Sequence, residues 1–529
     1  MTGWIKTSLG ELCHITMGQS PPSNTNEVMK ELRINNEELP KGWINTTIGE
    51  VFEFEYGKGL TKAKRNENGK FPVYGSNGIV GYHNEFLIEA PALIVGRKGA
   101  AGEVSYSDKN CWPIDTTYFI KNLNNLNIKF AFYFLKSLML AQYDRSTAIP
   151  GLNRNDAYGI SFNLPPLFEQ HQIIFKIEEL FSELDNGVES LKKARQQLKT
   201  YRQAVLKHAF EGKLTQEWRE QQIEAGNPPE PAKKLLERIK KEREADYQKQ
   251  VEEWKKACKQ AQRCGSKKPA KPRKPKDLPP LTKKELDELP ELPEGWGWSY
   301  LDYCGYWIGG GTPSKQRKEY WLDGDVLWVS PKDMKNQYIK ITIDKITKTA
   351  VKESSAKLIP SGSVLFVVRS GILRRTLPVS ITTEISTVNQ DLQAFTPFKV
   401  FPEYIYWYCV ANEFHIRNNC AKSGTTVESI ETTQLKKYRI SVCSPEEQQA
   451  IVSEIETRLS VCDQLEQTIE DSLKKAEALR QSILKKAFEG ELTREWRLAH
   501  PELISGENSA ESLLARIRAE KAQLKWIKR

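Results

Sequence analysis

Two long cations between glycines form the clearest candidate binding loop in the sequence, Gly96-Arg97-Lys98-Gly99. Such a loop allows the backbone to approach a phosphate while the arginine side chain reaches a base edge. Arginine with guanine is the commonest specific contact between proteins and DNA. Arg97 is therefore the first candidate for reading a base sequence. A tight turn between two strands would need the same glycines, so that alternative stays open.

Other loops combine basic or polar side chains with small residues in the same way, and they fall into two regions of the chain. A solvated loop is the alternative explanation for the cluster between Lys58 and Arg65. The candidates for DNA contact in the first region are Lys58, Lys62, Lys64 and Arg65 for phosphates and Tyr74, Ser76, Asn77, Arg97 and Lys98 near the groove; those in the second region are Lys315, Lys332, Arg369, Ser370, Arg374, Arg375, Asn389 and Gln390, with Thr425 and Thr426 as contacts to the DNA backbone.

The composition allows a polyanionic partner and argues against several other classes of protein. The 529 residues predict roughly three or four structural units, and 78 Lys and Arg against 68 Asp and Glu give a formal charge of +10. No apolar run reaches the ~20 residues of a membrane span, and the start has no signal-peptide pattern, so we expect a cytoplasmic protein without a membrane segment. Nine cysteines without Cys-x-x-Cys spacing predict reduced, mostly buried thiols, with no metal site and no disulfide framework.

A long internal repeat organises the chain. The run LKHAFEGKLTQEWR, which begins at Leu206, matches LKKAFEGELTREWR, which begins at Leu484, at 11 of 14 positions with an offset of 278. The same offset carries Glu169-Gln170 onto Glu447-Gln448, Asp185 onto Asp463 and Arg202 onto Arg480 without a gap. An ungapped register of this length predicts mostly continuous helix, because insertions accumulate in loops.

Hydrophobic periodicity supports a long helix in each copy. The apolar positions alternate in steps of three and four, which is typical of a coiled-coil seam. A helix from Glu169 to Glu211 would be about 64 Å long at 1.5 Å per residue, and Gly212 and Gly490 stand where a left-handed residue would end each helix. The predicted seams are Ile173, Ile177, Leu180, Leu184, Val188, Leu191, Ala194, Leu198, Tyr201 and Val205 in the first copy, and Ile451, Ile455, Leu459, Cys462, Leu465, Ile469, Leu473, Ala476, Leu479 and Ile483 in the second.

A second, shorter repeat opens the segment before each helix. Leu39-Pro40-Lys41-Gly42-Trp43 pairs with Leu292-Pro293-Glu294-Gly295-Trp296, and the β-rich segments that follow diverge in sequence. Seven basic residues and three prolines between Arg263 and Lys276 predict an extended linker. We therefore divide the chain into an N-terminal extension (1–38), a first β-rich domain (39–163), a central helical region (164–244), a basic Pro-rich linker (245–291), a second β-rich domain (292–441) and a distal helical region (442–529).

The N-terminal extension contains a third, partial domain start. The residues from Trp4 to Leu12 resemble those from Trp43 to Val51 at an offset of 39, but no domain of their own follows them. We interpret the extension as a remnant of recombination or an accessory strand, with a functional arm as the alternative.

Two equivalent helices that pair through equivalent seams should be related by a pseudo-two-fold axis. The helices would then be antiparallel, with a β-rich domain at each of the opposite ends. The predicted fold class is α+β: two β-rich mixed domains, two long antiparallel coiled-coil helices and an internal pseudo-two-fold repeat. Duplex DNA is itself two-fold related, so two domains at a fixed separation suit two half-sites, which should differ because the domains differ.

These motifs, in this order, resemble the specificity subunits of Type I restriction-modification systems. The resemblance rests on the Leu-Pro-x-Gly-Trp openings, on the run from Leu164 to Gln170 with its weaker copy from Ser444 to Gln448, and on the two Ala-Phe-Glu-Gly endings. The glycine-rich run with Arg97 and the run Ser423-Gly424-Thr425-Thr426 add to it. It covers nearly the whole chain from Leu39 onward.

The resemblance implies two target recognition domains that bind the halves of an asymmetric bipartite site with a fixed spacer in double-stranded DNA. It implies docking of two methyltransferase subunits and of restriction subunits that are translocases and nucleases, within an antiviral defence system. S-adenosylmethionine, ATP and Mg would be bound by those partners, which would supply adenine-N6 methylation and ATP-dependent cleavage. This chain would bind no cofactor and would not be an enzyme, since Asn163-Leu164-Pro165-Pro166 is not the Asn/Asp-Pro-Pro-aromatic motif and no Walker lysine loop occurs.

The repeated helix endings are the candidates for partner docking. Trp218 with Arg219 and Trp496 with Arg497 could be anchors, because tryptophan and arginine are enriched at interface hot spots. Packing back onto the helix pair is the alternative. The charged stretches 233–256 and 511–528 are either partner contacts or solvated helix faces. A structural coiled-coil adaptor with two protein-binding modules is the alternative for the whole chain.

Overall fold

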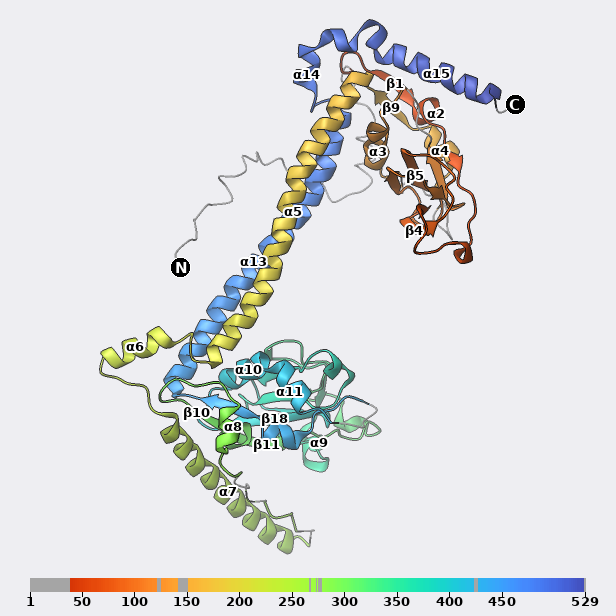
Figure 1. The fold of residues 1–529 in the computed structure, drawn as a ribbon. Helices are drawn as coiled ribbons and strands as arrows, with labels where there is room; N and C mark the ends of the chain where they lie inside the picture. Colours follow the sequence, from red (N-terminus) through yellow and green to blue (C-terminus); the bar gives the residue numbers. More distant parts are fainter. Residues whose placement is uncertain are drawn as a thin grey trace. The chain divides into compact units, whose positions relative to one another are not determined.

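The fold is described from a computed structural model that covers residues 39–120, 125–140, 151–265, 268–272, 274, 278–422 and 427–527. It divides into two compact units. Unit 1 combines the chain up to Glu189 with the chain from Leu473 onward, and unit 2 is Ser190–Ser472. Each unit contains one β-rich domain and a part of each of the two long helices, α5 (Leu167–Phe210) and α13 (Pro445–Phe488) (Figure 1).

The β-rich domain of unit 1 consists of two small sheets and a separate strand pair. One sheet has the strand order β2-β8-β5-β6, and the other has the order β4-β3-β7, in which β3 and β7 are parallel. The antiparallel pair β1·β9 brings the start of the domain beside its end, just before α5. The strands are β1 Ile44–Thr47, β2 Glu55–Tyr56, β3 Phe71–Gly75, β4 Gly78–His83, β5 Ala92–Gly96, β6 Val104–Ser107, β7 Trp112–Pro113, β8 Thr117–Ile120 and β9 Ser161–Leu164.

One apolar helix, α3 (Ile128–Ser137), covers this domain's core. The Asn127 side chain accepts hydrogen bonds from the backbone of Lys129 and Phe130, which caps the helix, and Phe134 is buried. The apolar side chains of this helix are therefore part of the domain's core. The other helical segments of unit 1 are α2 Ile48–Val51, η1 Lys62–Lys64, α4 Arg154–Tyr158, α14 Arg494–Ala499, η6 Pro501–Ile504, η7 Gly506–Asn508 and α15 Ala510–Ile527.

The β-rich domain of unit 2 repeats this topology although its sequence has diverged. Its larger sheet has the order β11-β18-β15-β16-β13, its smaller sheet has the order β14-β12-β17 with β12 and β17 parallel, and β10·β19 forms the closing pair. The strands are β10 Gly297–Tyr300, β11 Gly305–Gly309, β12 Val326–Val329, β13 Tyr338–Ile339, β14 Asp344–Ile346, β15 Val364–Val367, β16 Val379–Thr382, β17 Ser386–Val388, β18 Leu392–Pro397 and β19 Arg439–Val442.

Helix α7 (Ala232–Arg263) extends beyond residue 244, so residues 245–263 of the expected linker are helical. The helix continues because side chains four residues apart pair on its surface, such as Gln248 with Glu244. In addition, no proline interrupts the chain between Ala232 and Pro269. The other helical segments of unit 2 are α6 Gln216–Glu224, α8 Lys283–Asp287, η3 Leu301–Cys304, η4 Lys318–Tyr320, α9 Lys348–Glu353, η5 Gly371–Arg374, α10 Pro402–Ala411, α11 Glu413–Asn419 and α12 Thr432–Lys436.

The long helices pair antiparallel within each unit. In unit 1, Asp185 of α5 pairs with Arg480 of α13, and in unit 2 Arg202 pairs with Asp463 at 2.5 Å. These four residues are repeat equivalents, so each copy supplies the partner of the other. The predicted fold class, with two β-rich domains and antiparallel long helices, is confirmed.

Three residues of the predicted seam are more exposed than the others. Tyr201, Leu465 and Leu479 are 44%, 47% and 48% exposed, although the Tyr201 hydroxyl accepts a hydrogen bond from Arg458 of α13 at 3.4 Å. Arg202 and Arg480 follow two of these positions directly and form the ion pairs with the partner helix. The pairing of the helices at these positions therefore includes ion pairs beside the apolar seam.

A buried carboxylate joins three parts of unit 1. Glu169, in the first turn of α5, accepts a hydrogen bond from the Trp43 indole at 2.8 Å, from the Thr493 hydroxyl at 2.7 Å and from the Arg497 guanidinium at 2.5 Å. Arg497 also donates to the carbonyl of Gly490 at 2.9 Å. Burial raises the pKa of the Glu169 carboxyl, whereas these bonds act in the opposite direction. We call this arrangement the Glu169 clamp.

Unit 2 contains the same arrangement around Glu447, the Glu447 clamp. Its carboxylate accepts from the Trp296 indole at 2.9 Å, from the Thr215 hydroxyl at 2.8 Å and from the Arg219 guanidinium at 2.5 Å. Arg219 donates to the Gly212 carbonyl at 2.7 Å. Each clamp thus joins the opening of one β-rich domain, the start of the helix after it and the tail of the other helix.

The glycines that end the long helices have the predicted left-handed conformation. Gly212 has φ +73° and Gly490 has φ +77°. A Cβ on Gly212 would lie 2.4 Å from Pro293, and one on Gly490 would lie 3.0 Å from Pro40. The prolines of the two Leu-Pro-x-Gly-Trp openings therefore pack directly on these helix ends.

The charged stretches after the helix tails fold back on the domain of their own unit. In unit 1, Lys521 of α15 donates to the carbonyls of Gly49 and Phe52 at 2.7 and 3.0 Å. Its repeat equivalent in α7, Arg243, lies 3.8 Å from the Asp302 carboxylate in unit 2. One face of each helix is therefore a contact within the chain. Among the described residues, no helix is long and apolar enough to cross a bilayer.

All eight described cysteines are free thiols, and six of them are buried, as expected. Burial raises the pKa of Cys111 and Cys420 to about 11 and that of Cys304 to about 12. These three thiols therefore stay protonated near neutral pH.

The Glu169 clamp gives a test of what holds unit 1 together. Glu169→Ala would leave the Arg497 guanidinium buried without its carboxylate, so we expect it to lower the free energy of unfolding by about 3 to 5 kcal/mol in urea titrations followed by circular dichroism. Glu183→Ala, which removes an exposed carboxylate from the same helix, should cost less than about 0.5 kcal/mol. Equal losses from the two variants would show that the clamp contributes little.

Candidate nucleic-acid interface

In the unit 1 domain, two of the candidate loops meet at one backbone carbonyl. The oxygen of Thr116 accepts hydrogen bonds from the backbone N–H groups of Arg97 and Lys98 at 2.9 and 3.1 Å, and from the Ser76 hydroxyl at 2.6 Å. The loop between β7 and β8 thus fixes the turn after β3 and the turn after β5 at one edge of the domain. Three of the predicted DNA contacts lie together there.

Arg97 is held in place by this same loop. Its guanidinium donates to the Asp115 carbonyl through Nε at 3.2 Å and Nη2 at 2.6 Å, and it lies 5.3 Å from the ring centroid of Tyr56. A Cβ on Gly96 would lie 2.1 Å from the Ala100 carbonyl oxygen, so the run Gly96-Arg97-Lys98-Gly99 is a tight turn between β5 and β6. The tight-turn interpretation is therefore confirmed, and because the turn presents the arginine at the edge, base reading by Arg97 stays a prediction.

Two further candidates belong to this edge. The backbone N–H of Lys58 donates to the Pro113 carbonyl at 3.0 Å, and its side chain is exposed. Asn77 is exposed in the turn between β3 and β4, where Gly78 has φ +92°. We call Lys58, Ser76, Asn77, Arg97 and Lys98 the unit 1 edge.

The remaining candidates of unit 1 lie elsewhere or serve the fold. Lys62 and Lys64 are exposed in η1, and the Arg65 guanidinium donates to the Leu60 carbonyl at 3.2 and 2.7 Å. Tyr74 is a correction: it is 8% exposed and packs in a core cluster with Ile94, so its ring cannot reach a groove. β3 is buried on both faces, since Val73 and Tyr74 lie in two different core clusters, so its basic surroundings do not bring this side chain to the surface.

In unit 2, Arg369 occupies the position that Lys98 has in unit 1, directly beside the position of Arg97, where unit 2 has Val368. The backbone N–H of Arg369 donates to the Asp391 carbonyl at 3.3 Å as that of Lys98 donates to Thr116, and Arg369 forms a β-bridge with Ser429 as Lys98 does with Gly151. The Arg369 guanidinium pairs with the Asp391 carboxylate at 3.3 Å. No sequence similarity indicates this correspondence, which only the topology shows.

The other candidates of unit 2 divide between the edge and its support. Gln390 is exposed and bonds to Thr312, whereas Asn389 is 6% exposed and bonds to the backbone and carboxylate of Asp391. Asn389 is therefore a correction: its amide holds the loop. Lys332 is exposed shortly after β12, at the position equivalent to Asn77.

Three further unit 2 candidates have partners that help to place them. The Arg374 side chain pairs with Glu428 at 2.7 Å, and the backbone N–H of Ser370 donates to the carbonyl of Glu428 at 3.1 Å. Lys315 lies 6.0 Å from the Trp321 ring, and Arg375 is exposed. Thr425 and Thr426 lie outside the described residues.

The candidates for partner docking are partly used within the chain. Arg219 and Arg497 belong to the two clamps, and Arg497 is 9% exposed, so their guanidinium groups are not available as anchors. Trp218 and Trp496 are half-buried, and Trp496 stacks on His500 at 5.0 Å. Docking through the two tryptophans stays a prediction. The repeated helix endings showed that these residues are important to the structure or the function. Repetition alone does not tell whether such residues contact their own chain or a partner subunit.

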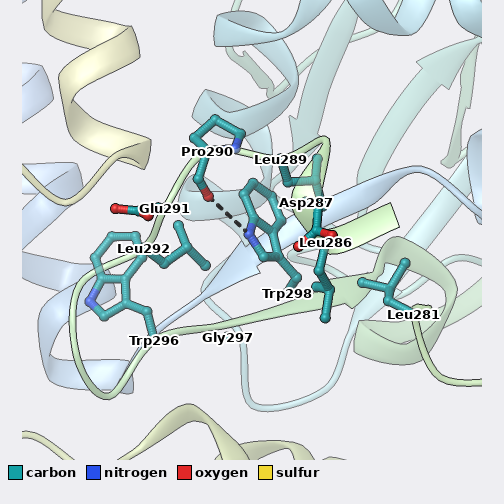
Figure 2. A pocket seen from close by; sticks show the side chains of 10 residues that line it. All are labelled: Leu281, Leu286, Asp287, Leu289, Pro290, Glu291, Leu292, Trp296, Gly297 and Trp298. Atoms are coloured by element: carbon teal, nitrogen blue, oxygen red, sulfur yellow. Dashed lines mark hydrogen bonds between the residues drawn. The ribbon is translucent and has the colours of Figure 1, made fainter. Parts of the chain in front are cut away.

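A pocket in unit 2 has a different character from the two edges. It encloses about 640 Å³ between the segment before the Leu292 opening and β10, and the Trp298 indole donates to the Pro290 carbonyl at 3.3 Å (Figure 2). Its lining is mostly apolar and includes Asp287 and Glu291 but no cation. This charge would repel phosphates, and none of the predicted DNA contacts lines the pocket.

A family model described as the Type I restriction modification DNA specificity domain matches residues 40–200 and 298–475. The chain belongs to this family of specificity subunits. The two matches each contain one β-rich domain and much of the long helix after it.

Relatives of this specificity subunit match it over most of the chain. The specificity subunit of the Type I restriction enzyme EcoDI from Escherichia coli is 26% identical over 489 residues, which cover 92% of this chain and 96% of the relative. The EcoR124I/EcoR124II specificity subunit from Escherichia coli is 40% identical over 185 residues, 35% of this chain and 45% of that relative. A chain solved in work on assembly and conformational transition of a type I R-M system shares the fold at 18% identity and a TM-score of 0.54, covering 86% of this chain and 100% of that chain.

Arg97 and Arg369 give one variant for the edge of each domain in the specificity subunit. We expect Arg97→Ala and Arg369→Ala each to relax selectivity at one base position and to cost about 1 to 3 kcal/mol of binding, because an arginine that reads a base edge is specific for it. Lys64→Ala, a predicted phosphate contact, should weaken binding to all sequences alike. The measurement is a binding titration against duplexes changed at single positions, and a uniform loss from Arg97→Ala would make it a phosphate contact.

Proposed function

We propose that this chain is the sequence-reading subunit of a Type I restriction-modification complex and that it binds an asymmetric bipartite site in double-stranded DNA. Each β-rich domain would read one half-site, and the repeated helices would fix the spacer. The observation that carries the proposal is the shared topology of the two domains, which places Lys98 and Arg369 at one position, next to Arg97 in unit 1, with different neighbours.

The electrostatics of the two edges support DNA as the ligand. In unit 1, Lys58, Arg97 and Lys98 lie around one loop, and in unit 2 Lys332 and Arg369 lie around the equivalent loop. Long cations on turns tied to a rigid sheet edge can approach phosphates and base edges without ordering a flexible segment first. Because the surrounding residues differ between the edges, the two half-sites should differ in sequence.

The proposal extends to the partners. Two methyltransferase subunits would dock on the helical regions, with restriction subunits that act as translocases and nucleases joining the complex. The partners would bind S-adenosylmethionine, ATP and Mg and supply the chemistry, and this chain would be non-catalytic. The names of the relatives, all specificity subunits of Type I restriction enzymes, support this division of labour.

Replacement of one domain tests the proposal. If residues 292–441 are exchanged for the corresponding domain of a specificity subunit with a known target, one half-site should change while the other half-site and the spacer stay the same. Genome-wide mapping of methylated adenines in cells that express the complete system measures both halves at once. A change in both half-sites would contradict modular reading, and complete methyltransferase activity without any fixed site would favour a structural adaptor.

A further inference from the structure

An exposed tyrosine of the unit 1 domain lies against two guanidinium groups. Tyr56, on β2, is 53% exposed, and the guanidinium carbons of Arg97 and Arg154 each lie 5.3 Å from its ring centroid. Contacts of this length between a cation and an aromatic ring are attractive. Arg154 was not among the residues predicted from the sequence, because the turn that carries it is far from Arg97 along the chain.

The backbone fixes Arg154 relative to the Arg97 turn. The N–H of Leu152 donates to the Arg97 carbonyl at 2.9 Å, and Gly151 forms a β-bridge with Lys98. Arg154 then begins α4, capped by the Asn153 side chain, which accepts from the N–H of Asn155 at 2.8 Å. The position of the second guanidinium therefore follows from the same turn that presents the first.

The contacts of Arg154 hold its guanidinium group in place without neutralising its charge. Nη1 donates to the Phe54 carbonyl at 3.4 Å, and the guanidinium lies 5.9 Å from the Tyr158 ring. Within the described ranges, neither Arg97 nor Arg154 forms an ion pair with a carboxylate. Two neighbouring guanidinium groups, both always charged, favour an anion beside them.

The equivalent place in unit 2 does not have this pair of arginines. Val368 stands at the position of Arg97, and Thr432, which begins α12, stands at the position of Arg154. Arg369, at the position of Lys98, pairs with the Asp391 carboxylate at 3.3 Å. The nearby arginine of unit 2 is therefore neutralised by a carboxylate, whereas the two guanidinium groups of unit 1 lie together on one ring.

We propose that Arg154, together with Tyr56 and Arg97, forms a phosphate-binding site of the unit 1 domain, in which Arg154 contacts a DNA phosphate and thereby sets the register at which Arg97 meets a base. This inference rests on the proposed function, since it assigns a further residue to the same edge. Tyr56 is a positioning residue whose ring holds both guanidinium groups. A phosphate is the anion expected, because the DNA backbone presents one beside every base pair that Arg97 could read.

The test measures binding of the complex with its methyltransferase subunits to a cognate duplex and to an unrelated duplex over a range of salt. Arg154→Gln should weaken binding to both duplexes by about tenfold and lower the slope of log K against log salt by about 0.9, the value of one phosphate contact in B-DNA. Arg154→Lys keeps the charge and should retain the slope, with affinity within about threefold. Lys109→Gln also removes one positive charge and is the matched control. Lys109 is exposed after the C-terminal end of β6, whereas the Arg97 turn precedes the start of that strand.

Each other outcome has a definite meaning. An Arg154→Gln variant that behaves like the Lys109→Gln control, or one that loses affinity only for the cognate duplex with an unchanged slope, overturns the phosphate site. If Arg154→Lys loses as much as Arg154→Gln, the residue acts through folding and the inference is wrong. If the unmodified complex does not distinguish the two duplexes, the proposed function fails, whatever the variants show.

Discussion

A negative charge without water is costly, and this chain buries one at the first turn of each long helix. Glu169 and Glu447 are completely buried, and each is compensated by a tryptophan, a threonine and an arginine that come from separate parts of the sequence. The carboxylate is tolerated only where all three donors reach it. The opening of a domain, the start of its helix and the tail of the other helix must therefore meet at one point.

This constraint explains why the scaffold repeats while the rest of the chain diverges. The clamp residues lie in the matched motifs, namely the Leu-Pro-x-Gly-Trp openings, the Glu-Gln pairs and the helix tails. Gln170 and Gln448 beside the clamps also act alike, since their side chains accept from the backbone N–H of Asn127 and Phe401, which stand before α3 and α10. The loops at the sheet edges are free of such demands and can differ, which suits domains that read different sequences.

Much of the scaffold could be predicted from the sequence, because repetition and periodicity are local signals. The offset of 278 relates Asp185 and Arg202 to their copies, which form the ion pairs between the long helices. The apolar steps of three and four predicted the helices themselves. Tyr201 and Leu479 are more exposed than the seam predicts, and the arginine that follows each of them pairs across the helices, which a seam read from apolar residues alone ignores. The predicted linker began at residue 245, whereas α7 continues to Arg263. The prolines that define the linker begin only at Pro269, and they do not show where the helix before them ends.

The candidate site was predicted in composition more than in geometry. Lys98 and Arg369 were both named, but their equivalence depends on strand order, which the diverged sequences do not reveal. Tyr74 and Asn389 were assigned to DNA because they lie beside basic or small residues, whereas a strand buried on both faces and a loop hydrogen bond turn them inward. Arg154 was missed because only the pairing of Gly151 with Lys98 brings it to Arg97.

If the equivalent edges of the two domains read different halves of one DNA site, each edge should contact one half only. Photo-crosslinking from position 77 and from position 332, which follow the equivalent strands β3 and β12, measures this in the assembled complex. We expect the two positions to crosslink to opposite half-sites, each at bases within one half only. Crosslinks from both positions to the same half-site, or to no fixed position in the DNA, would show that the edges do not divide the site between them.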